Sequence, residues 1–134
     1  MENVSGVLPE WRIGGTAFTS GIANRANPLA YHKDGANFPD SWNAMIILSH
    51  RTKGGLTVVP EYRFAISPQA PVLTLMNSSE LWHGVTPINK AKGGYRYSAV
   101  YYAMHHLCNC GTRDEELSRL RLLKTERERK RAEA

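Results

Sequence analysis

The stretch "LAYHKDGANFP" (residues 29–39) places a histidine and an aspartate two positions apart, directly after an apolar run. In a β-strand successive side chains point to opposite faces, so residues two apart point the same way. On a strand, His32 and Asp34 would therefore stand side by side. If that face points into a pocket, the imidazole nitrogen and the carboxylate oxygen form a chelating pair. On a solvent face they are an ordinary polar pair.

Size and composition favour one compact domain. The chain has 134 residues, of which 42% are hydrophobic, enough to bury a sizeable core. No apolar run approaches the roughly 20 residues of a membrane span, and "MENVSGVLPEWR" (1–12) lacks the basic start and apolar stretch of a signal peptide. We expect a soluble intracellular protein, cytoplasmic or nuclear, without a membrane partner. The net charge of +5 is compatible with a polyanionic partner such as nucleic acid.

The chain before Gly111 is a series of short apolar and β-branched runs separated by turn signals. Six runs predict strands: "AMIILSH" (44–50), "LTVVP" (56–60), "YRFAIS" (62–67), "PVLTLM" (71–76), "LWHGVTP" (81–87) and "YRYSAVYYAM" (95–104). The turn signals between them include "TKGG" (52–55), whose glycines permit positive φ, and "NKAKGG" (89–94). The first thirty residues predict loops with at most short strands. Many closely spaced strands are typical of a sandwich, jelly roll or barrel.

The composition changes after Gly111 to "TRDEELSRLRLLKTERERKRAEA" (112–134), which predicts a helix. Thr112 or Asp114 could cap its start, and the leucines at 117, 120 and 123 form a short apolar stripe. From residue 113 onward there are eight Lys and Arg against six Asp and Glu. We interpret the last residues as a solvated helix end or a disordered tail, with a phosphate-contacting basic arm as the alternative. The predicted organisation is a domain over 1–111, with its core at 29–104, and a basic helix or tail over 112–134.

Two cysteines, Cys108 and Cys110, follow His105 and His106. Free thiols in a reducing compartment are the favoured interpretation. Zinc sites usually have two separated ligand pairs with wider spacing, so zinc binding is the weaker alternative.

A second histidine and a basic residue complete a pattern with the opening pair. His83 lies in a predicted strand, and two histidines with one carboxylate are the ligand set of non-haem Fe(II) oxygenases. Arg96 and Ser98, again two apart on a predicted strand, share a face. The guanidinium offers a rigid fork of donors suited to a carboxylate, and the hydroxyl could add another donor.

This order of residues resembles the Fe(II)/2-oxoglutarate-dependent dioxygenases, which have a double-stranded β-helix (jelly-roll, cupin-like) core. Three stretches, "KGGLTVVPEY" (53–62), "LWHGVTP" (81–87) and "GYRYSAVYY" (94–102), are most similar to the TET/JBP nucleic-acid base oxygenases. The resemblance covers roughly residues 29–104. It implies a mainly β jelly roll, followed here by the C-terminal helix. It also implies hydroxylation of the methyl group of thymine or 5-methylcytosine in DNA.

Carried over residue by residue, the resemblance implies that His32, Asp34 and His83 bind Fe(II). Arg96 would pair with the distal carboxylate of 2-oxoglutarate, assisted by Ser98, and O₂ would be the second cosubstrate.

Two further residues are candidates for contacting the substrate. Asn37, three residues beyond Asp34, could touch the substrate or the cosubstrate, and a turn-forming role is the alternative. Tyr62 borders "VVPEY" and could stack on an extruded base, although such aromatic residues are most often core residues.

Three other functions are compatible with the same residues. An oxygenase of this fold could act on a protein or a small molecule, and the metal and Arg96 positions do not separate these substrates. A non-catalytic cupin-like binding domain is the second alternative. The third takes the basic C-terminal helix as the functional part, with the β-domain as its scaffold.

Overall fold

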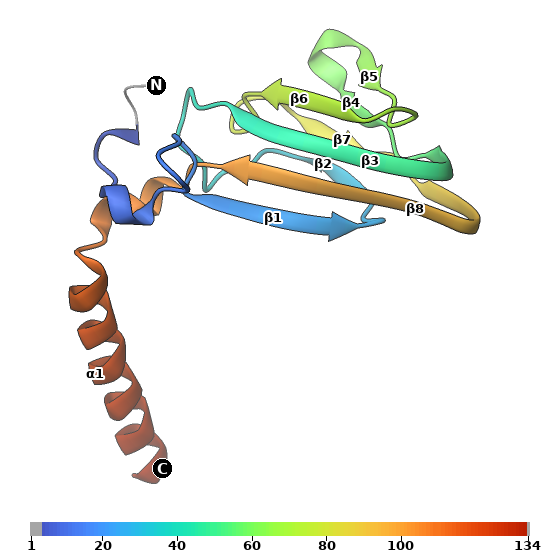
Figure 1. The fold of residues 1–134 in the computed structure, drawn as a ribbon. Coiled ribbons are helices and arrows are strands. Elements are labelled where there is room, and N and C mark those ends of the chain that lie inside the picture. The colour runs from blue at the N-terminus through green and yellow to red at the C-terminus, as the bar shows by residue number, and fades with distance from the viewer. Residues whose placement is uncertain (1–3, 134) are drawn as a thin grey trace.

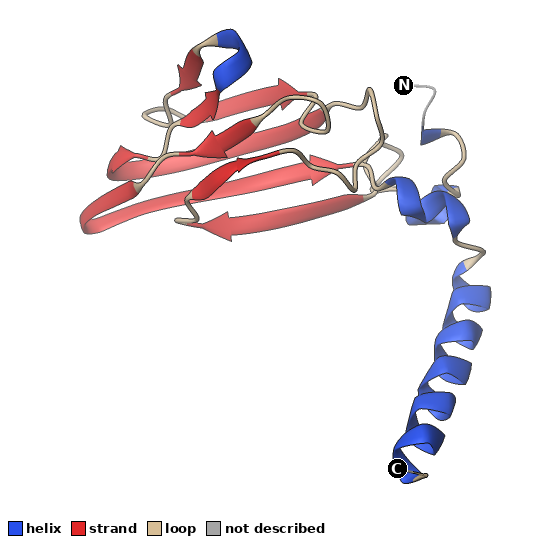
Figure 2. Cartoon of the chain, turned by 180° about the vertical axis from the view of Figure 1, so that it is seen from behind, coloured by secondary structure: helices blue, strands red, loops and turns tan. Residues whose placement is uncertain are grey.

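The computed structural model describes residues 4–133, and its body consists of two four-stranded antiparallel sheets (Figure 1). The first sheet has the order β1 (Ser20–Arg25), β8 (Ile88–Tyr102), β3 (Asn43–Gly54) and β6 (Val72–Met76). The second has the order β2 (Leu29–His32), β7 (His83–Val85), β4 (Thr57–Val59) and β5 (Phe64–Ile66). The smaller sheet lies behind the larger one, as the reverse view also shows (Figure 2).

Strands distant in the chain are neighbours in both sheets, because the chain crosses repeatedly between the two layers. The last strand, β8, pairs with both β1 and β3, and β2 pairs with β7. This arrangement is consistent with the double-stranded β-helix. The prediction of a mainly β jelly-roll fold followed by one α-helix is therefore confirmed, and all six predicted strands are present.

The pairing of β3 with β8 is the longest in the molecule and contains one irregularity. The register runs from Ala44↔Tyr101 to His50↔Tyr95 and resumes at Thr52↔Lys90. Residues 91–94 on β8 therefore lie opposite the single residue Arg51, whose φ of 49° marks the bulge. The predicted turn at 52–55 is present at its glycine end, where Gly54 and Gly55 have φ of 74° and 68° between β3 and β4, although its first residues still pair with β8. The predicted turn at 89–94 is wrong, because this stretch lies within β8. Both polar, glycine-containing stretches begin within a strand pairing, and the bulge absorbs the extra residues.

The sequence predicted loops with at most short strands over the first thirty residues, whereas β1 is a regular strand of six residues. Its sequence, "SGIANR", has low strand propensity, yet all six residues pair with β8 from Ser20↔Tyr102 to Arg25↔Tyr97. Pairing with a long neighbour outweighs weak local propensity.

A small satellite core joins the N-terminal segment to the end of β8. Val4, Val7, Phe38 and Ala103 are buried together. The described residues also include the short 3₁₀ helices η2 (Pro9–Trp11), η3 (Pro60–Tyr62) and η4 (His105–Asn109). Cys108, inside η4, and Cys110, directly after it, are free thiols, and neither belongs to a cluster of metal-ligand side chains among residues 4–133.

The C-terminal segment is one continuous helix, α1 (Arg113–Ala132), which extends away from the sheets (Figure 1). The predicted cap is Thr112: its hydroxyl accepts from the backbone N–H of Glu115, whose carboxylate accepts from the backbone N–H of Thr112. None of the residues of α1 is buried. Within residues 4–133 no helix has both the length and the apolar character needed to cross a membrane.

The cap should control the helicity of α1, because no buried residue supports the helix from elsewhere. We expect Thr112→Ala to destabilise α1 by about 1 kcal/mol, seen as reduced ellipticity at the helical wavelength. Thr125→Ala, in the exposed middle of α1, is the matched control and should retain the signal. Equal helicity in both variants would contradict the assigned cap.

Candidate metal centre

A cavity of about 530 Å³ lies between the two sheets. Both sheets and the connections between their strands contribute to its wall. The polar residues that line it are His32, Asp34, Asn37, Asn43, Ser78, His83, Arg96 and Ser98, together with Asn24, Asn27, Lys33, Thr57, Thr74 and Tyr102. All of the predicted site residues except Tyr62 therefore border one space.

The two histidines of the predicted set are direct cross-strand partners, because β2 and β7 pair with the register His32↔His83. Their ring centroids are 4.3 Å apart. Each Nδ1 lies within hydrogen-bonding distance of a backbone carbonyl: 2.9 Å from Ala30 O for His32 and 3.0 Å from Leu81 O for His83. A carbonyl oxygen only accepts, so each Nδ1 carries a proton, and in the neutral ring each Nε2 presents a lone pair. Both Nε2 atoms are thereby prepared as metal ligands.

Asp34 reaches the histidines from a loop. The sequence predicted that it would share a strand face with His32, but β2 ends at His32 and Asp34 lies two residues beyond it. Its backbone N–H donates to Ser78 O at 2.9 Å, which holds the loop in place. Its Oδ1 is 3.4 Å from Nε2 of His32 and 3.9 Å from Nε2 of His83. One ligand atom from each of the three residues lies within 4.8 Å of the others.

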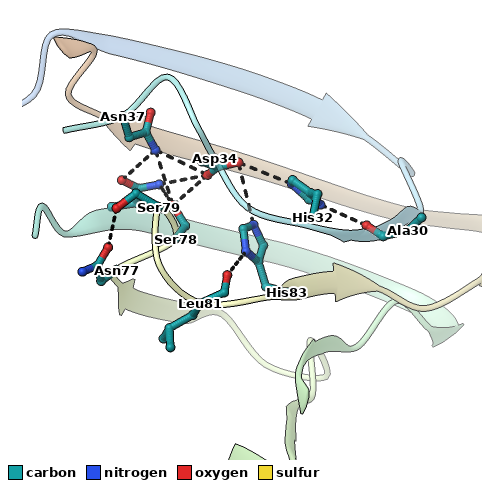
Figure 3. A network of polar contacts seen from close by, with 10 residues as sticks. Ala30, His32, Asp34, Asn37, Asn77, Ser78, Ser79, Leu81 and His83 are labelled. Carbon is teal, nitrogen blue, oxygen red and sulfur yellow. Dashed lines mark hydrogen bonds and ion pairs between the residues drawn. The ribbon is translucent and has the colours of Figure 1, made fainter. Parts of the chain in front are cut away.

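The other carboxylate oxygen of Asp34 is held by hydrogen bonds (Figure 3). Oδ2 accepts from the hydroxyl of Ser78 at 2.7 Å, from the amide of Asn43 at 3.2 Å and from the amide of Asn37 at 3.4 Å. The amide of Asn43 also contacts the Ser78 hydroxyl. With Oδ2 occupied in this way, Oδ1 alone faces the two histidines, so Asp34 is prepared to bind a metal through one oxygen.

Asn43 and Ser78 were not predicted from the sequence. Both are almost fully buried, 4% and 1% exposed, although a polar strand start and a "NSSE" turn suggest ordinary surface residues. A polar residue at the start of the apolar run "NAMIIL" is the only local signal. Ser78 lies 44 residues from Asp34 in the chain, so no spacing motif links them.

Arg96 is buried in the wall of the same cavity. Only 2% of this residue is exposed, and Ser98, two residues along β8, is also buried. The Nε of Arg96 donates to Gly55 O at 3.2 Å, whereas the Nη2 of Arg96 has no hydrogen-bond partner within residues 4–133. Burial lowers the pKa of the Arg96 guanidinium. A buried cation with an unused donor is costly unless an anion pairs with it, so this position suits a carboxylate ligand.

The close approach of Arg96 requires the glycine at position 55. Gly55 has a φ of +68°, as expected for the Gly-Gly turn, and a Cβ there would lie 2.9 Å from both Cδ and Nε of Arg96. The glycine thus makes room for the guanidinium and supplies the carbonyl that orients it.

The two predicted substrate-contacting residues lie in different environments. Asn37 is 6% exposed and belongs to the hydrogen-bond network around Asp34, inside the cavity. Tyr62 is 63% exposed and stacks on Phe64 with ring centroids 6.2 Å apart. It does not line the cavity.

Fold and cavity together define a double-stranded β-helix with a His-Asp-His cluster between its sheets. Comparison with solved structures finds a similar fold in NgTET1, solved in complex with 5mC DNA. The TM-score is 0.65 at 15% sequence identity, and the match covers 90% of this chain and 48% of that chain. This chain thus spans about half the length of that TET protein, with which it shares the fold. No protein-family model matches the sequence, and no curated protein matches it either.

Ser78 should hold Asp34 ready for a metal. We expect Ser78→Ala to weaken the binding of Co²⁺, used as a stable substitute for Fe²⁺, by about 10–100-fold, because outer hydrogen bonds orient metal ligands. Isothermal titration measures the affinity. The matched control is Ser79→Ala, since the Ser79 hydroxyl donates to Asn77 Oδ1 instead of Asp34. Equal loss in both variants would show that Ser78 has no specific role.

Proposed function

We propose that this chain is an Fe(II)- and 2-oxoglutarate-dependent dioxygenase that hydroxylates the methyl group of a DNA base, thymine or 5-methylcytosine. The observation that carries the proposal is the content of one cavity. It brings a His-Asp-His cluster together with a buried arginine that has an unused donor. These are the two binding functions that a metal and an acidic cosubstrate require.

The three clustered side chains fit an octahedral, oxygen-activating metal. Nε2 of His32, Nε2 of His83 and Oδ1 of Asp34 converge, and three protein ligands leave positions open for other groups. When bound, Fe(II) would supply the activation of O₂ needed to oxidise a C–H bond. The protein side chains hold the ion and fix which positions stay open.

Arg96 and Ser98 would hold the far carboxylate of 2-oxoglutarate. Nη2 of Arg96 is free to donate, and the hydroxyl of Ser98 lies on the same side of β8. Both residues border the cavity that contains the His-Asp-His cluster. A diacid bound by Arg96 at one end therefore presents its keto-acid end toward the cluster, and the partly enclosed space limits the access of water.

Three observations support a DNA base as the substrate. The chain carries a net charge of +5, its fold is similar to that of a TET protein solved with 5mC DNA, and three of its stretches resemble TET/JBP sequences. A base must leave the duplex to reach an enclosed site. Asn37, inside the cavity beside Asp34, is our candidate for contacting that base, and the exposed ring of Tyr62 is our candidate for stacking outside the cavity.

Anaerobic titration with Fe(II) and 2-oxoglutarate tests the cofactor chemistry. We expect a weak visible charge-transfer band in the wild type. Arg96→Ala should weaken 2-oxoglutarate binding by roughly 10–150-fold, since hydrogen bonds to charged groups contribute about 1.5–3 kcal/mol. Arg25→Ala, an exposed arginine on the outer side of the same sheet, should leave the band unchanged. Folded protein without a band would contradict the proposal and favour a binding domain.

The substrate is tested separately with duplex oligonucleotides that contain 5-methylcytosine or thymine. Mass spectrometry of the digested DNA should detect a hydroxymethyl base only with Fe(II), 2-oxoglutarate and O₂ present. His83→Ala should abolish the product, whereas His50→Ala, outside the cavity, should retain it. Consumption of 2-oxoglutarate without any modified base, on single- or double-stranded DNA, would instead favour a protein or small-molecule substrate.

A further inference from the structure

The loop that carries Asp34 is attached to the rest of the domain at both of its ends. At its start, the backbone N–H of Asp34 donates to Ser78 O at 2.9 Å. At its end, the backbone N–H of Phe38 donates to Ala103 O, also at 2.9 Å. This second attachment joins the loop to the residues that directly follow β8. The position of the candidate metal ligand therefore depends on two segments that are far from it in the chain.

His105, the first residue of η4, makes two hydrogen bonds to the loop. Its backbone N–H and its ring Nδ1 lie 3.1 Å and 2.9 Å from the same acceptor, the carbonyl oxygen of Ala36. A carbonyl oxygen only accepts, so Nδ1 carries the proton and His105 donates both bonds. The rings of His105 and Phe38 also meet at 80° in a T-shaped contact, with centroids 6.4 Å apart. His105 thus contacts the residues on either side of Asn37.

Asn37 connects the end of the loop to the carboxylate of Asp34. The backbone of Asn37 forms an isolated antiparallel bridge with Met104, directly before His105. The side-chain amide of Asn37 donates to Asp34 Oδ2 at 3.4 Å and to Asn43 Oδ1 at 3.3 Å. One residue therefore joins the outer attachment to the hydrogen bonds that leave Oδ1 of Asp34 facing the two histidines.

The segment that presents His105 is itself held by the N-terminal part of the chain. The backbone N–H of Met104 donates to the hydroxyl of Thr19 at 2.9 Å. The buried residues of the satellite core also join this segment to the loop and to the N-terminal residues: Val4, Val7, Phe38 and Ala103. Because these contacts support it independently of Asp34, His105 holds the end of the loop instead of following its position.

We propose that His105 is a positioning residue for the metal centre. It holds residues 36–38 from outside the cavity and, through Asn37, orients the carboxylate of Asp34 toward the metal. His105 does not line the cavity, so its side chain acts on the affinity for the ion only through the loop. Outer hydrogen bonds that orient a ligand change metal affinity in this way. The inference rests on the metal centre of the proposed function and adds a residue to it.

Isothermal titration with Co²⁺ in place of Fe²⁺ tests this role. We expect His105→Ala to weaken Co²⁺ binding about 3–10-fold, because one neutral hydrogen bond is lost while the backbone bond to Ala36 remains. His105→Asn should restore most of the affinity, since its amide nitrogen can donate from the position of Nδ1. His106→Ala is the matched control and should bind like the wild type. The His106 ring lies 3.8 Å from that of His105, centroid to centroid, but its side chain makes no hydrogen bond within residues 4–133.

Two further measurements distinguish positioning from a general loss of stability. The visible absorption bands of bound Co²⁺ report the arrangement of its ligands, and they should change in His105→Ala but not in His106→Ala. In the wild type, Co²⁺ should slow the amide hydrogen exchange of Phe38 and His105 more than that of residues 88–90, because coupling between two sites is reciprocal. Thermal melts of the metal-free variants establish that each is folded.

The outcomes separate this inference from the proposed function. Equal Co²⁺ affinity in the wild type and in His105→Ala would overturn the inference and leave the metal site in place. Equal losses in His105→Ala and His106→Ala would also overturn it, because the cause would then be a disturbed η4. If His105→Ala does not fold, the exchange experiment decides, and equal slowing at His105 and at residues 88–90 contradicts the inference. A wild type that binds no Co²⁺ would contradict both the proposed function and the role of His105.

Discussion

The pairing of β3 with β8 is the constraint on which the other features depend. Its register turns Arg96 and Ser98 toward the cavity and Tyr95 and Tyr97 toward the outside. Because side chains alternate with a period of two, a slip of one residue would exchange these sets. The guanidinium would then face water, and a tyrosine would take its place in the cavity wall.

The sequence predicted the parts of the site that follow from short spacings. His32 with Asp34, and Arg96 with Ser98, are each two residues apart, and alternation correctly placed the second pair on one side of β8. For the first pair the prediction that the two side chains lie close together was right, but the reason given, a shared strand face, was wrong. Asp34 lies in a loop, and its position depends on hydrogen bonds with Ser78, one donated by its own backbone N–H and one accepted from the Ser78 hydroxyl, instead of strand geometry.

What the sequence did not predict depends on contacts between distant parts of the chain. The buried hydrogen bonds that Asn43 and Ser78 donate to Asp34 join three separate segments of the chain. The local composition of those segments does not predict these bonds. The "NKAKGG" stretch was interpreted as a turn because its residues favour turns, yet its first two residues pair with β3. In both cases tertiary pairing outweighs local preference.

The bulge opposite Arg51 divides the long ribbon of β3 and β8 into two segments with independent registers. The inner segment, 44–50 with 95–101, forms the wall of the cavity, whereas the outer segment, 52–54 with 88–90, carries no side chain that lines it. At the bulge, Gly94 packs against backbone carbonyls that leave no room for a Cβ, but the neighbouring Gly93 has open space around it. Residues added next to Gly93 would lengthen the excursion and leave the alignment of Arg96 unchanged. The ribbon therefore has a built-in position where the length of the chain can vary during evolution without rebuilding the site.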